Sequence, residues 1–218
     1  MVRVAAIEDH QVLVDALSLL LCKEEEMTFI GSAGTLTEGL EMVRGKKPDV
    51  LLLDVSLPDG NGLDYIPQFQ EHSPKTQILV LTTFTDESTL RRAIDCGVSG
   101  FLSKGSPLSD LLKAIHQAAE GEMVVPASLL ISLLKRQTRD KGGYSFEMQD
   151  WEPLTPRELE ILKSLAKGKS GVAIASELHI APLTVRTHVR NLLNKLGAHS
   201  RLEAVSFGLK YGLIDSPA

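Results

Sequence analysis

Acidic side chains follow two of the apolar runs in this sequence. Glu8 and Asp9 come directly after Val2–Ile7, and Asp54 follows four apolar residues that begin at Val50. Such runs are typical of buried parallel strands, whose carboxyl ends meet at one edge of a sheet, so we expect the three carboxylates to lie together. Close carboxylates repel one another unless a cation lies between them, and oxygen ligands suit Mg²⁺. The sequence therefore predicts a magnesium site beside Asp54.

Two further apolar runs end in polar side chains that complete this site. Thr82 ends the run Gln77–Thr82, and Lys104 follows Phe101-Leu102-Ser103. With Mg²⁺ bound, the charges of the metal and Lys104 balance those of the three carboxylates. A phosphoryl group on Asp54 would add negative charge, which the Thr82 hydroxyl and nearby backbone N–H groups would have to neutralise.

Each of these residues has an ordinary structural explanation when it is taken alone. An aspartate after a buried strand is often only a turn former or a helix cap, and a single lysine is usually solvated. The occurrence of all of them at four strand ends favours chemistry at this edge.

Five short apolar runs alternate with amphipathic stretches between residues 2 and 120. We predict strands at residues 2–7, 27–31, 50–54, 77–82 and 99–102, and helices near residues 11–22, 35–44, 61–70, 86–95 and 107–119. Parallel neighbouring strands need crossover connections, which the helices provide. The alternation therefore predicts an α/β fold with a doubly wound, five-stranded parallel sheet.

This first part of the chain resembles the receiver domain of bacterial response regulators, a flavodoxin-like fold. The resemblance rests on Glu8-Asp9, the turn Asp54–Gly62 with Leu57-Pro58, Thr82, and Phe101-Leu102-Ser103-Lys104. It implies the strand order 2-1-3-4-5. It also implies that a sensor histidine kinase phosphorylates Asp54, that Asp9, Asp54 and the carbonyl of Ser56 ligate Mg²⁺, and that Glu8 acts largely through water.

The same resemblance implies a switch. Lys104 pairs with the phosphoryl group, Thr82 moves toward it, and the ring of Phe101 swings into the space that Thr82 leaves. We therefore expect a phosphoacceptor rather than an enzyme, capable at most of self-phosphorylation from small donors and autodephosphorylation. The alternative is a Mg²⁺-dependent phosphatase with Asp54 as nucleophile, but such hydrolases usually carry a second carboxylate two residues later, where this chain has Ser56.

Charge is divided unevenly along the 218 residues. Residues 1–121 contain 10 Lys/Arg and 18 Asp/Glu, whereas residues 151–218 contain 9 and 6. This division suggests a cation site followed by a polyanion site. The sequence shows neither a signal peptide nor a membrane-spanning run, so we expect a cytoplasmic protein without membrane contact. We predict a receiver domain at residues 1–121, a linker with a short apolar helix at 122–152, and a second domain at 153–218.

The second domain begins with a helix-start signal. Thr155-Pro156-Arg157-Glu158 combines an N-cap, a proline at the first helical position and a glutamate at the third. A second short helix is expected from about Gly171 to Leu178, and a third from Pro182. In the third helix the residues Val185, Val189, Leu192, Leu193 and Leu196 form one apolar stripe. Two short helices before an amphipathic, basic-faced helix predict a small all-α helix-turn-helix domain.

This domain resembles the LuxR-type output domain of the NarL/FixJ family. The most specific motifs are Leu154-Thr155-Pro156-Arg157-Glu158 and Thr184-Val185-Arg186-Thr187-His188-Val189. The resemblance implies binding to double-stranded promoter DNA, with Arg186, Thr187 and Arg190 facing the major groove and His188 near the backbone. We assign to DNA binding the set Thr184, Arg186, Thr187, His188, Arg190, Asn191 and Lys195.

A final helix is predicted after a second capping signal, Ser200-Arg201-Leu202-Glu203. We predict that its apolar face, formed by Leu202, Val205 and Leu209, pairs with a second copy, and the resemblance implies a homodimer on a two-fold DNA site. The functional hypothesis is a DNA-binding regulator of transcription that phosphorylation of Asp54 switches on. The rival from the same family is a regulator that works without phosphate, controlled by dimerisation or a ligand.

Overall fold

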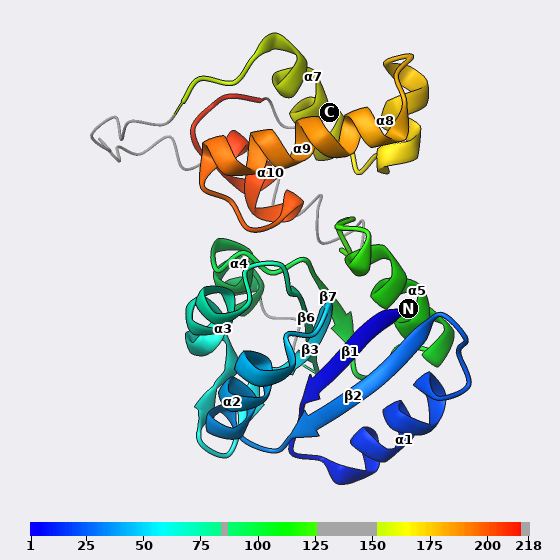
Figure 1. Cartoon of the computed structure of the whole chain (residues 1–218). Helices are drawn as coiled ribbons and strands as arrows, with labels where there is room; N and C mark the ends of the chain where they lie inside the picture. Colours follow the sequence, from blue (N-terminus) through cyan, green and yellow to red (C-terminus); the bar gives the residue numbers. More distant parts are fainter. Residues whose placement is uncertain (84–86, 126–151, 215–218) are drawn as a thin grey trace. The chain divides into compact units, whose positions relative to one another are not determined.

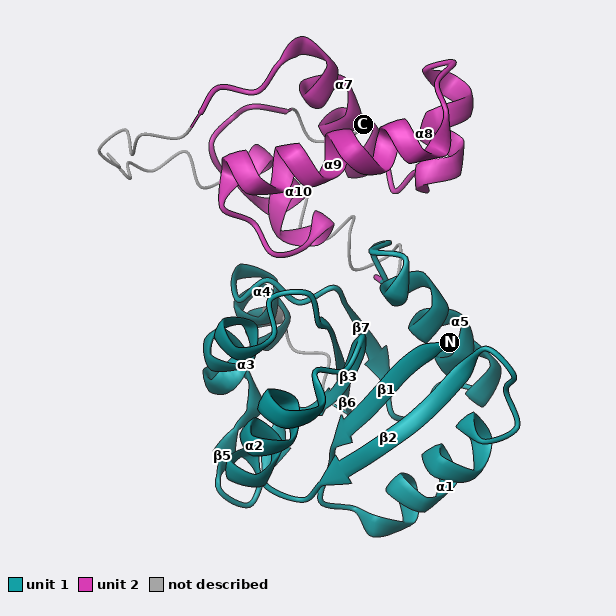
Figure 2. Ribbon diagram, viewed as in Figure 1, with its two compact units in different colours: residues 1–124 teal, residues 125–218 magenta. Residues whose placement is uncertain are grey.

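The protein is described here from a computed structural model that covers residues 1–83, 87–125 and 152–214. The chain divides into two compact units, residues 1–124 and 125–218 (Figure 2). The short helix predicted within the linker lies outside the described residues. Among the described helices, none is both long and apolar enough to cross a membrane.

Unit 1 contains a five-stranded parallel sheet. Its strand order is β2-β1-β3-β6-β7, which confirms the expected order 2-1-3-4-5 of the five main strands. Neighbouring strands are in parallel register, for example Leu52 with Leu79 and Thr82 with Ser103. The strands are β1 (Val2–Ile7), β2 (Met27–Ala33), β3 (Val50–Asp54), β6 (Gln77–Thr82) and β7 (Gly100–Ser103).

Helices cover both faces of this sheet. Figure 1 shows α1 and α5 on one face and α2, α3 and α4 on the other. Their bounds are α1 (Gln11–Leu21), α2 (Leu36–Lys46), α3 (Ile66–His72), α4 (Glu87–Asp95) and α5 (Leu108–Ala119), with a 3₁₀ turn, η1 (Gly62–Tyr65), before α3. The doubly wound α/β fold predicted from the sequence is confirmed.

Alternate side chains of the strands fill the two core layers. Val4, Leu52 and Leu79 pack with residues of α1 and α5 in one apolar cluster. All five residues of β3 are buried, because this central strand is covered on both faces. The sheet therefore holds the end of β3, with Asp54, rigidly in the middle of its carboxyl edge.

A small antiparallel hairpin follows Asp54. It consists of β4 (Ser56–Leu57) and β5 (Gly60–Asn61), with Ser56 opposite Asn61. Gly60 at its turn has a φ of 149°, which glycine adopts readily. Strands of two residues are too short to show a periodic pattern of apolar residues, so the sequence predicted only a turn here.

Unit 2 is all-helical in its described part. The helices are α7 (Pro156–Ala166), α8 (Gly171–Glu177), α9 (Pro182–Leu196) and α10 (Arg201–Lys210). The capping box at Thr155 and Glu158 is present with both of its hydrogen bonds. At the start of α10, Ser200 accepts a hydrogen bond from the Glu203 N–H (3.1 Å), while the Glu203 carboxylate accepts one from the His199 N–H (2.6 Å).

The apolar stripe of α9 forms the centre of this unit. Val185, Val189, Leu192 and Leu196 are buried, as the helical spacing predicted. They pack in a domain whose other buried residues include Ile161 of α7 and Ile174 of α8, and α9 contacts both of these helices. The opposite side of α9 is consequently left at the surface.

Candidate phosphoacceptor pocket and nucleic-acid interface

The predicted acidic residues meet at the carboxyl edge of the sheet. Glu8 and Asp9 follow β1, Asp54 ends β3, and Lys104 follows β7. Glu8 and Asp54 are buried, with residue exposures of 2% and 5%. Burying charged groups this deeply is costly unless they are paired, so the position of the lysine is decisive.

Lys104 bridges the two buried carboxylates. Its Nζ lies 2.7 Å from Glu8 Oε2, 2.8 Å from Glu8 Oε1 and 2.8 Å from Asp54 Oδ2. Burial alone would lower the pKa of Lys104, but hydrogen bonds to Asp54 and Glu8 outweigh burial and raise the pKa above its ordinary value. The lysine therefore remains charged and holds the pocket together.

Four side chains at this edge could hold a metal ion together. Ligand atoms of Glu8, Asp9, His10 and Asp54 all lie within 4.8 Å of one another. Carboxylate oxygens are hard ligands, which fit a cation such as Mg²⁺. The carboxylates meet as the sequence predicted, and the acidic cluster is able to bind a metal.

His10 is a member of this group that sequence reasoning did not single out. Its Nδ1 lies 2.9 Å from Glu8 Oε1 and 3.0 Å from Asp9 Oδ1. The hydrogen bond to Glu8, together with the negative charges of Asp9 and Glu8, raises the pKa of His10. The position of His10 directly after Glu8 and Asp9 in the sequence was the signal that could have identified it.

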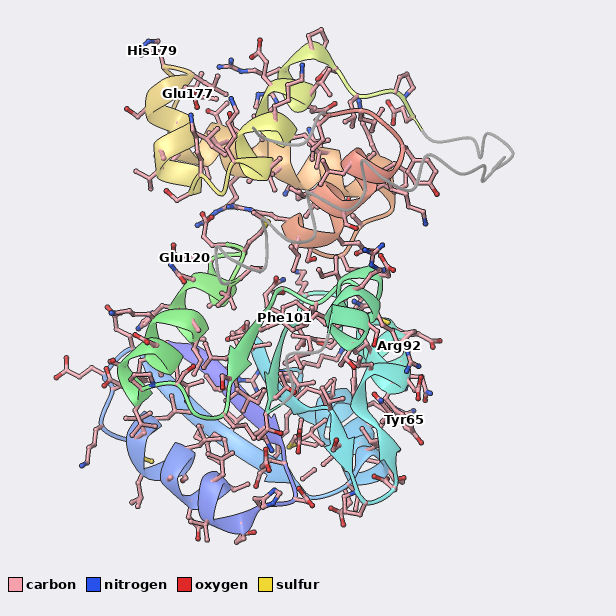
Figure 3. All side chains as sticks on the ribbon, turned by 180° about the vertical axis from the view of Figure 1, so that it is seen from behind. Tyr65, Arg92, Phe101, Glu120, Glu177 and His179 are labelled. Carbon is pink, nitrogen blue, oxygen red and sulfur yellow. The ribbon has the colours of Figure 1, made fainter. Side chains whose placement is uncertain are left out.

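The predicted switch residues lie beside the pocket. Thr82, at the end of β6, and Phe101, in β7, are both buried at 4% exposure, and Figure 3 shows Phe101 in the interior of unit 1. The backbone N–H of Lys104 donates to the carbonyl of Thr82 (3.0 Å), which ties the two strand ends together. The Ser56 N–H donates to Asp54 Oδ1 (3.3 Å).

The surface side of α9 carries most of the residues assigned to DNA binding. Thr184, Arg186, Thr187, Arg190 and Asn191 are exposed, and His188 is half-buried. The Thr187 hydroxyl donates to the carbonyl of Leu183 (3.0 Å), so it is held along the helix. An exposed helix face with two arginines, supported by α7 and α8, has the form of a recognition helix.

The two units match two family models. Residues 4–116 match the response regulator receiver domain, and residues 152–207 match the LuxR family of bacterial regulatory proteins. The receiver match alone spans more than half of the chain. This protein is a response regulator with a LuxR-type DNA-binding domain.

Relatives share this organisation over their whole length. The response regulator is 30% identical over 213 residues to the response regulator protein VraR of Staphylococcus epidermidis, covering 98% of this chain and 99% of the relative. A crystal structure of the response regulator ChrA of a heme-sensing two-component system is 27% identical, with a TM-score of 0.50 and 98% of each chain covered. RcsB of Salmonella enterica, solved on promoter DNA with the phosphomimetic BeF₃⁻, is 22% identical, with a TM-score of 0.56 and 96% and 98% covered. This last likeness shows the fold alone.

Lys195 of the response regulator has a different environment from the other residues assigned to DNA binding. Its Nζ lies 3.1 Å from Glu158 Oε2 and 3.3 Å from the carbonyl of Pro153. The hydrogen bond to Glu158 raises the pKa of Lys195, and its side chain is only 15% exposed. Lys195 therefore links α9 to the start of α7.

The prediction of a dimer face on α10 is wrong for two of its three residues. Leu202 and Val205 are 2% and 1% exposed and belong to the core of unit 2 itself. Leu209 is half-buried, and Lys210 and Tyr211 beside it are exposed. The helical stripe was identified correctly, but it packs inside its own domain, because a small domain needs those side chains for its core.

Proposed function

We propose that phosphorylation of Asp54 by a sensor histidine kinase controls DNA binding by this response regulator. The observation that carries the proposal is the buried Asp54 carboxylate, held by Lys104 at 2.8 Å next to Glu8. The ammonium group of Lys104 places a positive charge next to this reactive carboxylate. We expect the protein to act in the cytoplasm, where the chromosome is accessible to it.

Phosphoryl transfer to Asp54 is a displacement at phosphorus. An oxygen of the Asp54 carboxylate forms a bond to the phosphorus atom of the donor phosphohistidine, and the N–P bond breaks. The electron pair of that bond leaves with the imidazole nitrogen, which takes up a proton from water. Lys104 and the Ser56 N–H are placed to stabilise the negative charge around Asp54.

Mg²⁺ is the cation that we propose for this pocket, held by Asp9, Asp54 and the carbonyl of Ser56, with Glu8 acting largely through water. When bound, the metal neutralises charge on the transferring phosphoryl group. The Glu8, Asp9 and Asp54 oxygens fit this role because they are hard ligands gathered within 4.8 Å. Lys104 pairs with both buried carboxylates, and the His10 Nδ1 also contacts Glu8 Oε1 at 2.9 Å.

Two buried residues respond to phosphorylation of Asp54. We propose that Thr82 moves toward the phosphoryl group and that the Phe101 ring follows into the vacated space. Both side chains are buried on neighbouring strands, where Phe101 pairs with Val80, two residues before Thr82, so we propose that a shift of Thr82 changes the packing around Phe101. Phe101 has no hydroxyl, so packing alone sets the balance between its two positions.

The output is binding of a homodimer to double-stranded promoter DNA with two-fold half-sites. We propose that Thr184, Arg186, Thr187, His188, Arg190 and Asn191 form the DNA face, since they lie on the surface side of α9. Lys195 supports this face from its ion pair with Glu158. RcsB bound to promoter DNA with BeF₃⁻ provides a precedent for this use of the fold.

We test the proposal by mass spectrometry after incubation with acetyl phosphate and Mg²⁺. The wild-type protein should gain one phosphoryl mass, and Asp54→Ala should gain none. The control is Asp64→Ala, because Asp64 is an exposed aspartate of η1, and this variant should still be labelled. Asp59→Ala is unsuitable as a control because Asp59 lies in the loop that follows Asp54. Absence of labelling from acetyl phosphate or from any kinase would favour a regulator that works without phosphate.

A further inference from the structure

The carboxylate of Asp59 caps a helix that lies far from it in sequence. Its Oδ1 accepts a hydrogen bond from the Leu36 N–H (2.8 Å), and its Oδ2 accepts from the Thr37 N–H (3.1 Å) and the Thr37 hydroxyl (3.2 Å). Leu36 and Thr37 are the first two residues of α2, whose N–H groups have no partner within the helix. Asp59 thus joins the hairpin after β3 to the start of α2.

This hairpin begins beside the phosphoacceptor pocket, where the Ser56 N–H donates to Asp54 Oδ1 (3.3 Å). Asp59 occupies its turn, between β4 and β5, only five residues after Asp54. The Gly62 N–H closes the hairpin by donating to the carbonyl of Val55 (2.8 Å). A Cβ atom at residue 62 would collide with the carbonyl oxygen of Asp54, so the loop leaves the strand and returns to it within very little space.

From this geometry we propose that Asp59 is a positioning residue for the metal and phosphoryl chemistry at Asp54. Its contacts with α2 hold the turn of the hairpin, and the hairpin holds Ser56, whose N–H donates to Asp54 Oδ1 (3.3 Å). This inference rests on the proposed function, because Ser56 matters only if Asp54 accepts phosphate with Mg²⁺. Asp59 is not a member of the cluster of possible metal ligands, which is formed by Glu8, Asp9, His10 and Asp54.

The charge state of Asp59 suits this task. The hydrogen bond from the Leu36 N–H, followed by those from Thr37, lowers the pKa of Asp59 below its ordinary value. The carboxylate is therefore ionised at neutral pH. Its negative charge interacts favourably with the positive end of the α2 dipole. Both carboxylate oxygens of Asp59 accept hydrogen bonds from α2, so they fix the orientation of the hairpin turn relative to α2 as well as its distance from α2.

A purely structural role for Asp59 as a helix cap can be separated from positioning. Thr35 caps the same end of α2, accepting a hydrogen bond from the Glu38 N–H (3.3 Å) through its hydroxyl. No hydrogen bond of Thr35 to the hairpin is found among the described residues. Thr35→Ala therefore weakens the same helix end and leaves the attachment of the hairpin intact, which makes it the matched control for Asp59→Ala.

The test compares the full-length wild-type protein, Asp59→Ala, Asp59→Asn and Thr35→Ala. Mg²⁺ affinity is measured by calorimetric titration, and hydrogen exchange of the Ser56 and Gly62 amides is measured by NMR without metal. We expect Asp59→Ala to weaken Mg²⁺ binding about tenfold, as loss of outer-shell support commonly does. Exchange at both amides should be faster, Asp59→Asn should show a smaller effect because it keeps one acceptor, and Thr35→Ala should match the wild type.

Two results would overturn the proposal. One is unchanged Mg²⁺ affinity and unchanged amide exchange in Asp59→Ala. The other is an equal change in Thr35→Ala, which would assign the effect to the stability of α2. If the wild-type protein bound no Mg²⁺ and accepted no phosphate, the proposed function would fail, and amide exchange would still decide whether Asp59 holds the hairpin.

Discussion

The ammonium nitrogen of Lys104 lies 2.8 Å from Oδ2 of Asp54. The same nitrogen contacts Glu8 at 2.7 Å, and the Glu8 side chain is fully buried. One lysine therefore compensates two carboxylates at the end of a buried sheet. Because Asp9 adds a third carboxylate at this edge, we expect a bound cation to stabilise the folded protein.

Replacing Lys104 with methionine should destabilise the metal-free protein by about 3–5 kcal/mol, because Glu8 and Asp54 both lose the ammonium group that pairs with them in the buried pocket. Added Mg²⁺ should recover part of the loss by restoring positive charge. We would measure thermal unfolding in EDTA and in Mg²⁺, with Lys113→Met as the control, since the Lys113 side chain is 74% exposed. An equal loss in both buffers would contradict the charge argument.

Replacing Glu158 with glutamine should change the pH dependence of unfolding of unit 2. Burial raises the pKa of Glu158, but hydrogen bonds from Thr155 and Lys195 outweigh it and lower the pKa below the ordinary value of 4.5. The carboxylate therefore contributes stability that is complete above pH 4.5 and is lost as pH falls through the folded-state pKa.

The stability difference between wild type and Glu158→Gln should accordingly be largest near neutral pH and shrink in acid. Chemical denaturation between neutral and acidic pH measures it. Glu160→Gln is the control on the same helix, because the Glu160 side chain is 55% exposed. A difference that stays constant over the whole pH range would refute the assignment.

Replacing Arg190 with alanine should weaken DNA binding about tenfold and, if the guanidinium contacts phosphate, reduce the salt dependence by about one counterion. The helical circular dichroism signal should not change, because Arg190 is exposed. Fluorescence anisotropy on DNA enriched from a random pool measures both effects. Lys163→Ala, at an exposed position of α7, should bind as the wild type does; equal binding by Arg190→Ala would remove this residue from the DNA face.

Leu202 and Leu209 of α10 should respond differently to truncation. Leu202→Ala should destabilise unit 2 by about 2–5 kcal/mol, as is typical of a buried leucine. Leu209→Ala should leave folding nearly intact and lower the fraction of dimer formed with beryllofluoride, which sedimentation measures. A normal dimer fraction in Leu209→Ala would move the dimer contact away from this part of α10.

Local signals explain what could be predicted from the sequence. The strand Val50–Asp54, the capping box at Thr155 and the stripe along α9 depend on residues close together in the chain, and the structure contains all three. The convergence of Glu8, Asp54 and Lys104 followed from one further rule, that parallel strands share a carboxyl edge.

Contacts between distant segments could not be predicted in this way. Asp59 caps α2, and Lys195 forms an ion pair with Glu158. Both contacts join residues 22 or more positions apart, so they produce no periodic pattern in the sequence. The apolar stripe on α10 was visible, but its spacing alone did not tell whether it packs inside the domain or against a second copy. The burial of Leu202 and Val205 decided this.

We expect the state of Asp54 to set the affinity of the protein for DNA. The most direct measurement is DNA binding by full-length wild type and Asp54→Ala, each with and without beryllofluoride and Mg²⁺, on the same enriched DNA. Beryllofluoride should tighten DNA binding by the wild type about 5- to 150-fold, the range of typical coupling energies, and should leave DNA binding by Asp54→Ala unchanged. Equal wild-type affinity with and without beryllofluoride would contradict this expectation.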